Sequence, residues 1–306
     1  MSTERPGFGP TVPDVVHVTP PKPNVLEVEN VTKEFALRRS LGEIVSRTDP
    51  EVHRAVDDVS FTLRQGEILG LAGGSGSGKT TLARCLIRLV EPDAGKVRLG
   101  GADMLAAQGD ELRELRRRMQ MVFQDPYASL NPRMTVGQAL HEAGRAHHRP
   151  GAEDGPAFVA RALERVHLSA RFADRKPKEL SGGQRQRVAV ARALAVDPEV
   201  LIADEAVSAL DVSVQAQLLK LFVDLRDELG VAIVFVAHQL AVIAEVADRV
   251  AIMQTGRIVE IGETAAVFGA PQHEYTQALL GAHPRPNPRL RKGAAAATTT
   301  TAEVAT

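Results

Sequence analysis

An eight-residue segment combines glycines, a lysine and a hydroxyl at the spacing G-x-x-x-x-G-K-[ST], which is typical of a phosphate-binding loop. It follows the apolar run 67–72 and precedes residues 80–89, whose apolar positions have helical spacing. Glycine backbone can turn its N–H groups inward around phosphate oxygens, and the start of a helix adds positive potential there. The segment predicts a nucleotide site rather than a flexible Gly/Ser loop. Its residues are Gly73, Gly74, Ser75, Gly76, Ser77, Gly78, Lys79 and Thr80.

Two side chains of this segment and two acids elsewhere could supply the chemistry of phosphate transfer. Lys79 is expected to reach the β- and γ-phosphates of ATP, and the Thr80 hydroxyl to bind Mg²⁺. The apolar run 200–203 ends in Asp204 and Glu205. Because ligands of an open α/β sheet bind at the carboxyl ends of its strands, both carboxylates are expected to face the phosphate loop. We expect Asp204 to hold Mg²⁺ through water and Glu205 to act as general base on the attacking water; the alternative is a strand that ends in solvated acids.

Strand-like apolar runs alternate with helical patterns along the chain. The run 188–195 reads as a buried helix, and Thr255-Gly256 between two strand-like runs is a hairpin signal. This alternation predicts an α/β fold with a parallel sheet, to which the N-terminal runs add an antiparallel layer. The strand-like runs are 25–31, 56–63, 67–72, 119–123, 200–203, 231–237, 250–254 and 257–260.

Composition excludes several classes of function. The 306 residues include 37 basic and 38 acidic side chains, a formal net charge of −1, which argues against non-specific nucleic-acid binding as the main role. The single cysteine, Cys85, rules out an intrachain disulfide and a cysteine metal cage, and favours a reducing, cytoplasmic compartment. No run approaches the ~20 apolar residues of a membrane helix. The basic cluster of Arg113 and residues 116–118 is interpreted as a solvated helix face that pairs with Glu111 and Glu114.

Four further motifs carry a resemblance to one protein family. Residues 180–187, Leu-Ser-Gly-Gly-Gln-Arg-Gln-Arg, resemble the signature motif of ATP-binding-cassette (ABC) ATPases, which other P-loop proteins lack. Residues 208–211, Ser-Ala-Leu-Asp, resemble the loop that follows the second carboxylate in these ATPases. Gln124 resembles their Q-loop glutamine and His238 their switch histidine. The order along the chain also fits the family.

The resemblance implies a fold and a division of the chain. The fold is a P-loop NTPase with a RecA-like parallel-sheet core, an N-terminal antiparallel β subdomain and an inserted helical subdomain at about 125–190. The ABC ATPase domain would span 24–270. A Pro-rich arm, 1–23, precedes it, and a short extension, 271–292, follows; the arm and the Gly-Ala-Thr-rich tail, 293–306, are predicted to be disordered.

The resemblance also implies roles for single residues. Gln124 would contact the metal or the attacking water, and His238 the γ-phosphate. A head-to-tail dimer would sandwich each ATP between the phosphate loop of one subunit and the signature of the other, and hydrolysis would open the sandwich. Phe35, just after the first strand, stands where the family stacks the adenine, although a core phenylalanine is equally expected. Further nucleotide contacts are implied for Thr81, Ser181, Gly182, Gly183, Gln184 and Asp211.

A longer motif points to a subfamily. Residues 124–133, Gln-Asp-Pro-Tyr-Ala-Ser-Leu-Asn-Pro-Arg, and the segment 256–280 resemble the ATPases of dipeptide and oligopeptide importers. This implies two membrane permease subunits, a second ATPase that is identical or different, an extracytoplasmic solute-binding protein, and a peripheral location on the cytoplasmic face of the membrane. An importer of another solute such as nickel, an ABC exporter, and a soluble ABC ATPase that acts on nucleic acid are the alternatives; no nucleic-acid partner is expected.

Some positions depart from the subfamily or leave their role open. Gly74 replaces a usual glutamate, which predicts a more flexible loop, and Ala206-Val207 replaces a usual Pro-Thr, which removes a fixed φ after Glu205. None of these changes removes a catalytic group, so active hydrolysis is expected. In the helical insertion, Tyr127, Leu130 and Met134 are either exposed apolar anchors for a membrane subunit or ordinary core residues.

Overall fold

The computed structural model describes residues 22–36, 52–125, 129–208 and 210–282 of the chain. Apart from residues 22 and 23, the predicted N-terminal arm lies outside these ranges. The predicted C-terminal tail and Tyr127 also lie outside them.

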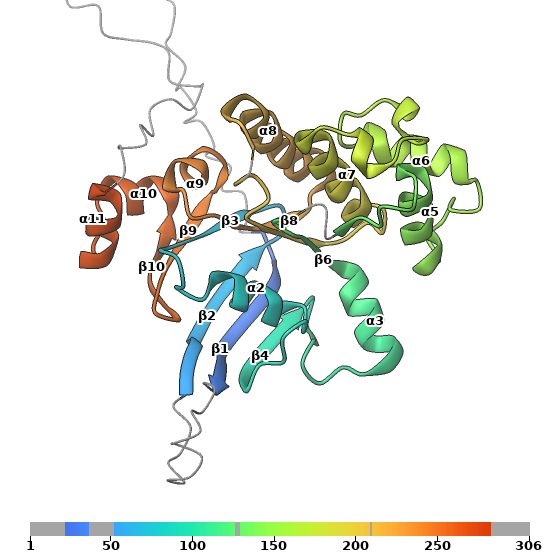
Figure 1. The fold of residues 1–306 in the computed structure, drawn as a ribbon. Coiled ribbons are helices and arrows are strands. Elements are labelled where there is room, and N and C mark those ends of the chain that lie inside the picture. The colour runs from blue at the N-terminus through green and yellow to red at the C-terminus, as the bar shows by residue number, and fades with distance from the viewer. Residues whose placement is uncertain (1–21, 37–51, 126–128, 209, 283–306) are drawn as a thin grey trace, which may run out of the picture.

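A six-stranded sheet forms the centre of the molecule, with strand order β10-β9-β3-β8-β7-β6 (Figure 1). Neighbouring strands from β9 to β6 are parallel, and β10 pairs antiparallel with β9 through the predicted Thr255-Gly256 turn. The parallel strands are buried on both faces, which explains their continuous apolar sequence. The strands are β3 (Ile68–Ala72), β6 (Met119–Val122), β7 (Val200–Asp204), β8 (Ala232–Val236), β9 (Arg249–Gln254) and β10 (Arg257–Glu263).

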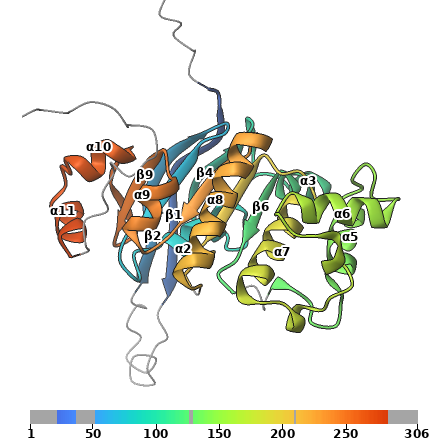
Figure 2. The same ribbon diagram turned by 90° about the horizontal axis from the view of Figure 1, so that it is seen from above.

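The two faces of this sheet belong to two separate hydrophobic clusters. Side chains alternate across a strand, so Ile233 and Phe235 of β8 face one cluster, and Val234 and Val236 face the other. The first cluster includes α8 (Val212–Leu229), whose Phe222 meets the Phe235 ring edge-on at a centroid distance of 5.3 Å. The helices α9 (Leu240–Val246) and α8 cover this face of the sheet (Figures 1 and 2).

A four-stranded antiparallel sheet, of order β2-β1-β4-β5, supplies the second layer, as the N-terminal pattern predicts. The helix α2 (Lys79–Leu86) is buried between the two sheets, and its Leu82 and Leu86 are fully buried in the second cluster. Cys85 of the same helix is buried, and burial raises the pKa of its thiol to about 11. The strands are β1 (Asn24–Ala36), β2 (Val52–Arg64), β4 (Ala94–Leu99) and β5 (Ala102–Asp103).

Between β6 and β7 the chain forms a helical lobe at the β6 edge of the sheet (Figure 2). Side-chain caps start its helices: Thr135 accepts from Gln138 N, Asp154 from Ala157 N, and Ser181 from Gln184 N. The lobe agrees with the helical insertion implied by the resemblance, although its exact limits stay a prediction. Its elements are α5 (Val136–Ala146), α6 (Gly155–Glu164), the short 3₁₀ helices Ala170–Phe172 and Pro177–Glu179, and α7 (Gly182–Leu194).

In this part of the chain the structure decides one open alternative and corrects one prediction in part. Leu130 is only 4% exposed and packs in the first cluster, so it is a core residue rather than an exposed anchor, while Met134 is half-buried. The arginines of α3 (Gly109–Arg118) match the predicted face only in part. Arg117 pairs with Glu114 at 2.6 Å, as predicted, but other arginines of the cluster bind other parts of the fold. Arg116 donates to the Ile87 and Arg88 carbonyls, and Arg118 pairs with Glu199.

The described part of the chain closes with two short helices beyond β10, on the far side of the sheet from the helical lobe (Figure 1). They are α10 (Thr264–Gly269) and α11 (Glu274–Gly281). In the described part of the chain, no helix is long and apolar enough to cross a membrane.

Candidate nucleotide-binding site

The phosphate loop runs from the end of β3 to the start of α2, as predicted. Two of its glycines are required by the approach of neighbouring backbone. Gly78 has a φ of 99°, and a Cβ there would stand 2.0 Å from the Ala55 carbonyl oxygen. Gly73 has a φ of 151°, and a Cβ there would stand 2.2 Å from the Met253 carbonyl oxygen. The strands β2 and β9 thus fix the shape of the loop from both sides.

The ammonium group of Lys79 is held inside this loop. Lys79 is 5% exposed and donates to the Gly73 and Gly74 carbonyl oxygens at 2.9 and 2.8 Å and to Ser77 Oγ at 3.1 Å. Burial lowers the pKa of Lys79, and the nearby carboxylates Glu205 and Asp204 oppose that shift. Two backbone carbonyl oxygens and one hydroxyl thus hold the cation inside the loop.

The end of β7 faces the loop, as expected for a parallel sheet. Asp204 is 3% exposed and accepts a hydrogen bond from the Thr80 hydroxyl, with 3.0 Å between the oxygens. Burial raises the pKa of the Asp204 carboxyl, against the effect of the Thr80 hydrogen bond and of the cations Arg84 and Lys79. A buried carboxylate beside a hydroxyl favours a bound cation, which would restore its charged form. The expected alternative, a solvated acid, is therefore wrong for Asp204.

Two side chains from neighbouring strand ends meet at the carboxylate of Glu205, which itself follows β7. Gln124 Nε2, after β6, donates to Glu205 Oε2 at 2.9 Å, and His238 Nδ1, after β8, lies 3.6 Å from the same oxygen. The Glu205 backbone has a φ of 48°, an uncommon conformation for a non-glycine residue. Its N–H donates to the Val236 carbonyl at 3.0 Å, which fixes the turn against β8. The structure thus joins in one cluster three residues that are far apart in the sequence.

The turn after Glu205 is held without the proline that the subfamily usually has there. Ala206 and Val207 are each 3% exposed and pack in the first hydrophobic cluster. The Ser208 N–H and Oγ both donate to the Glu205 carbonyl, at 3.1 and 3.0 Å. Burial and these two hydrogen bonds replace the restriction on φ that a proline would supply.

The signature residues start one helix and Asp211 starts the next. The exposed Ser181 caps α7, which begins at Gly182, six residues earlier than the apolar pattern indicates. Asp211 caps α8 by accepting from Val214 N at 3.0 Å, and this hydrogen bond lowers the pKa of its carboxyl. The two helix starts touch, because a Cβ on Gly183 would stand 2.3 Å from Val214 Cγ1.

Phe35 lies near the end of β1 and is not a core residue. Its side chain is 41% exposed, and the Lys33 ammonium lies 5.5 Å from the centre of the ring. An exposed aromatic face is what adenine stacking requires, so the stacking role stays a prediction.

One contact of the phosphate loop has no signal in the sequence. The Gly74 N–H donates to the Tyr275 hydroxyl of α11 at 3.0 Å, across 201 positions of the chain. The predicted flexibility of the loop at Gly74 is therefore opposed by a hydrogen bond from another part of the chain. The C-terminal pattern around Tyr275 indicates a subfamily but not which element the tyrosine touches.

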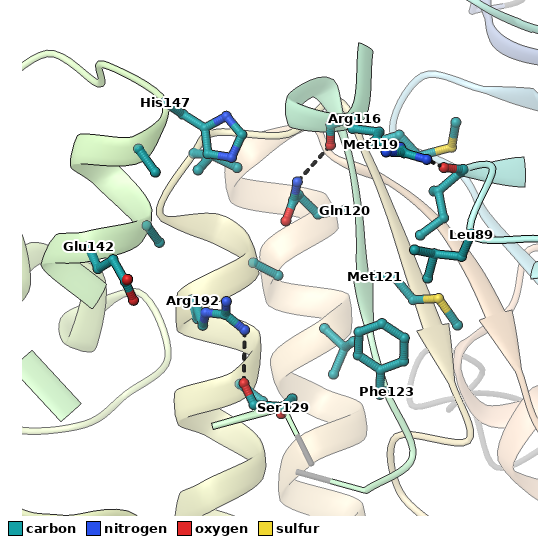
Figure 3. A pocket seen from close by; sticks show the side chains of 17 residues that line it. Leu89, Arg116, Met119, Gln120, Met121, Phe123, Ser129, Glu142, His147 and Arg192 are labelled. Carbon is teal, nitrogen blue, oxygen red and sulfur yellow. Dashed lines mark hydrogen bonds between the residues drawn. The ribbon is translucent and has the colours of Figure 1, made fainter. Parts of the chain in front are cut away.

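A cavity of about 450 Å³ lies between the helical lobe and the sheet edge (Figure 3). The β6 side contributes Met121 and Phe123, and the lobe contributes Glu142 and Arg192. Arg192 donates to the Ser129 carbonyl at 2.8 Å across the floor. Gln124 directly follows the cavity-lining Phe123, so this cavity and the Glu205 cluster share one segment of chain.

The fold and these contacts define a P-loop nucleotide-binding protein. A family model described as "ABC transporter" matches residues 56–208, and one described as "Oligopeptide/dipeptide transporter, C-terminal region" matches residues 259–305. The chain is 48% identical over 264 residues to the "Probable peptide ABC transporter ATP-binding protein y4tS" of Sinorhizobium fredii, with 86% of this chain and 74% of that protein covered. The chain belongs to the ABC transporter family, and it is an ATPase subunit of that family.

Other relatives agree on the family and the fold. The chain is 49% identical over 268 residues to the "Glutathione import ATP-binding protein GsiA" of Escherichia coli K12, with 88% of this chain covered but only 42% of that longer protein. The solved structure of cbiO1 from Clostridium perfringens, part of the ABC transporter complex cbiONQ, has a TM-score of 0.68 and 26% identity over 81% of this chain and 91% of that one. The dimeric structure of MJ0796, a bacterial ABC transporter cassette, has a TM-score of 0.67 and 28% identity over 78% of this chain and 98% of that one. The predicted ABC ATPase fold is confirmed.

Proposed function

We propose that the chain is the ATP-hydrolysing subunit of a membrane importer for dipeptides, oligopeptides or related small solutes. One observation carries the catalytic part: the ends of β6, β7 and β8 bring Gln124, Glu205 and His238 together beside the phosphate loop. Glu205 acts as general base on the attacking water. Gln124 holds that carboxylate in place, and His238, whose side chain is exposed, contacts the γ-phosphate.

The phosphate loop binds the triphosphate of ATP. Lys79 neutralises the β- and γ-phosphates, and the loop N–H groups cradle their oxygens. The hydrogen bonds from Lys79 to Gly73 and Gly74 show that its ammonium already points into the loop. Phe35 supplies the face on which the adenine stacks, since its ring is exposed at a strand end.

The residues at the end of β7 fit a bound Mg²⁺. The described residues contain no group of three histidine, cysteine or acidic side chains that could hold a metal alone. Mg²⁺ is commonly held by one or two side chains together with substrate phosphates and water. Thr80 and the buried Asp204, with 3.0 Å between their oxygens, match that pattern. Gln124, the third expected metal ligand, is hydrogen-bonded to the next residue, Glu205. Bound Mg²⁺ would supply charge neutralisation of the phosphates.

A second cassette completes the nucleotide site. The exposed Ser181, with the N-terminus of α7, offers a hydroxyl and backbone N–H groups to an anion. Beside Asp211, the side chain of Val212 is 84% exposed and is accessible to another subunit. We assign this surface to the partner ATPase, so that each ATP lies between a phosphate loop and a partner's signature. The structure of the related cassette MJ0796 is dimeric, which supports the pairing of two cassettes.

The membrane permeases dock at the cavity between the sheet edge and the helical lobe. Leu89 at its rim is 53% exposed, and Met121 and Phe123 line its wall, so an apolar element of another chain can bury surface there. The segment from Phe123 to Gln124 leads directly to Glu205. Movement of a docked permease can therefore alter the position of the general base. This docking places the subunit at the cytoplasmic face of the membrane, together with two permeases and, indirectly, a solute-binding protein.

The assignment of peptides as the transported solute is based on similarity to other proteins and not on the nucleotide site. The C-terminal family match and the peptide and glutathione importers among the relatives support it. The test is purification of the tagged chain from its host membranes in mild detergent. We expect two permeases to co-purify, with ATP hydrolysis by the complex stimulated by a peptide-loaded binding protein. Recovery of the chain only with nucleic acid, or stimulation by nickel but not by peptides, would refute the peptide-importer assignment.

A further inference from the structure

The C-terminal helix α11 holds the phosphate loop through one hydroxyl group. Tyr275 lies in the first turn of α11 and is half-buried. Its Oη accepts the Gly74 N–H at 3.0 Å. In the structure, this hydrogen bond joins the last helix directly to the loop that binds ATP.

The hydrogen bond acts on the same peptide group that binds the essential lysine. The Gly73 carbonyl, which accepts from Lys79 Nζ at 2.9 Å, and the Gly74 N–H, which donates to Tyr275, are the two ends of one peptide unit. A peptide unit is planar and rigid, so fixing its N–H end also fixes the direction of its carbonyl. Hydrogen bonds at both ends of a peptide polarise each other and strengthen together. The Tyr275 hydroxyl therefore fixes the direction of one of the three acceptors that bind the Lys79 ammonium.

The tyrosine is itself held by the sheet. The Glu260 carboxylate of β10 accepts the Gln272 N–H at 2.9 Å and the His273 N–H at 3.1 Å, just before α11. His273 Nδ1 then accepts the Tyr275 N–H at 3.1 Å. These hydrogen bonds fix the first turn of α11 on β10, so the hydroxyl has a defined position relative to the loop.

The space beside Gly74 is shaped by the same contact. Gly74 does not have a positive φ, so its backbone would accept a side chain without strain. A Cβ on Gly74 would stand 3.0 Å from Tyr275 Oη. Among the described residues, apart from its two chain neighbours, no other heavy atom lies within 4 Å. At this position the hydroxyl, and not the turn of the loop, leaves little room for a side chain.

We infer that Tyr275 is a positioning residue for ATP binding, by which the C-terminal extension pre-organises the phosphate loop. This rests on the nucleotide site of the proposed function. Without the hydroxyl, the Gly73–Gly74 peptide can rotate, and ATP must then order it on binding. Because the effect is exerted on the free loop, it changes the affinity for ATP more than the rate of the chemical step.

The test compares Tyr275→Phe with the wild-type chain in steady-state hydrolysis of Mg–ATP and in calorimetric titration with ATP. We expect the KM and the Kd for ATP to rise about three- to tenfold, with kcat within twofold. Glu274→Gln, an exposed neighbour in the same turn, is the matched control and should leave both constants unchanged.

A second substitution tests the contact from the loop side. Gly74→Ala pushes against the hydroxyl and should raise the KM by a similar factor. In the Tyr275→Phe background, the added methyl meets no hydroxyl, so Gly74→Ala should have no further effect. Independent effects that multiply would overturn the inference. If Tyr275→Phe lowers stability too far for assay, Gly74→Ala still decides the question, because it keeps the tyrosine.

The outcomes also separate this inference from the proposed function. A wild-type chain and complex that hydrolyse no ATP would refute the proposed function, whatever Tyr275 does. A wild-type chain that hydrolyses ATP, with Tyr275→Phe unchanged in KM and Kd, would refute only the role of Tyr275. A fall in melting temperature without any change in ATP affinity would show that the hydroxyl merely anchors α11, which also overturns the inference.

Discussion

The contact between the starts of α7 and α8 leads to a sharp prediction about Gly183. A Cβ at Gly183 would stand 2.3 Å from Val214 Cγ1, whereas carbon atoms pack favourably at about 3.5–4.0 Å. Val214 lies in a helix, where a valine has one strongly preferred χ1 rotamer, so it cannot easily turn away. Gly183→Ala must therefore push the two helix starts apart by roughly 1 Å.

Two effects of opposite sign decide the size of the change. Overpacking costs about 1–3 kcal/mol, while alanine favours the helix over glycine by up to about 1 kcal/mol. The clash is larger, so Gly183→Ala should lower the free energy of unfolding by about 1–2 kcal/mol. For a domain of this size, that corresponds to a fall of about 2–8 °C in melting temperature.

A double-mutant cycle in urea unfolding checks the reasoning. In the Val214→Ala background the clash is absent, so Gly183→Ala should be neutral or stabilising there. The sign of its effect therefore depends on the residue at position 214. Equal destabilisation in both backgrounds, or stabilisation in both, would refute the packing argument.

Further predictions concern the site, the core and the C-terminal attachment. Glu205→Gln should lower kcat by about 10²–10⁴-fold while ATP still binds, as measured by steady-state hydrolysis and calorimetry; near wild-type turnover would remove Glu205 from its role. Phe35→Ala should raise the KM for ATP with little change in kcat, and an unchanged KM would exclude stacking. Phe235→Ala, which empties a fully buried site against Phe222, should cost about 3–5 kcal/mol in urea unfolding, and a cost below about 1 kcal/mol would contradict the packing. Partial burial raises the pKa of Glu260, but hydrogen bonds from the backbone N–H groups before α11 lower it, with a net shift below the ordinary 4.5. Its contribution to stability is therefore present above pH about 4.5 and is lost as the pH falls through the lowered pKa, so the melting-temperature difference between wild type and Glu260→Gln should shrink on acidification from pH 7 to 4.

Short segments of sequence determined most strands and helices, because an apolar run or a glycine-rich turn can be recognised within a few residues. The continuous apolar run at 231–237 predicts a strand buried on both faces, and β8 is that strand. The glycines around Lys79 predict the phosphate loop because only glycine allows the backbone conformations that it needs. The limits of helices depend on more than the apolar pattern. The apolar pattern starts a helix at residue 188, but the Ser181–Gln184 capping box starts α7 at Gly182.

Tertiary structure decided which distant residues meet. The sequence places Gln124, Glu205 and His238 after separate strands, and only the order β8-β7-β6 brings their side chains to one point. Leu130 has an apolar side chain in a polar stretch, and only packing shows that it is buried. Nothing near Gly74 or Tyr275 in the sequence links them, because a hydrogen bond across 201 residues depends on the path of the whole chain. The sequence by itself determined the elements and the chemistry of the loop, whereas the contacts that position Lys79 and Glu205 arise only from packing the sheet and its C-terminal helix.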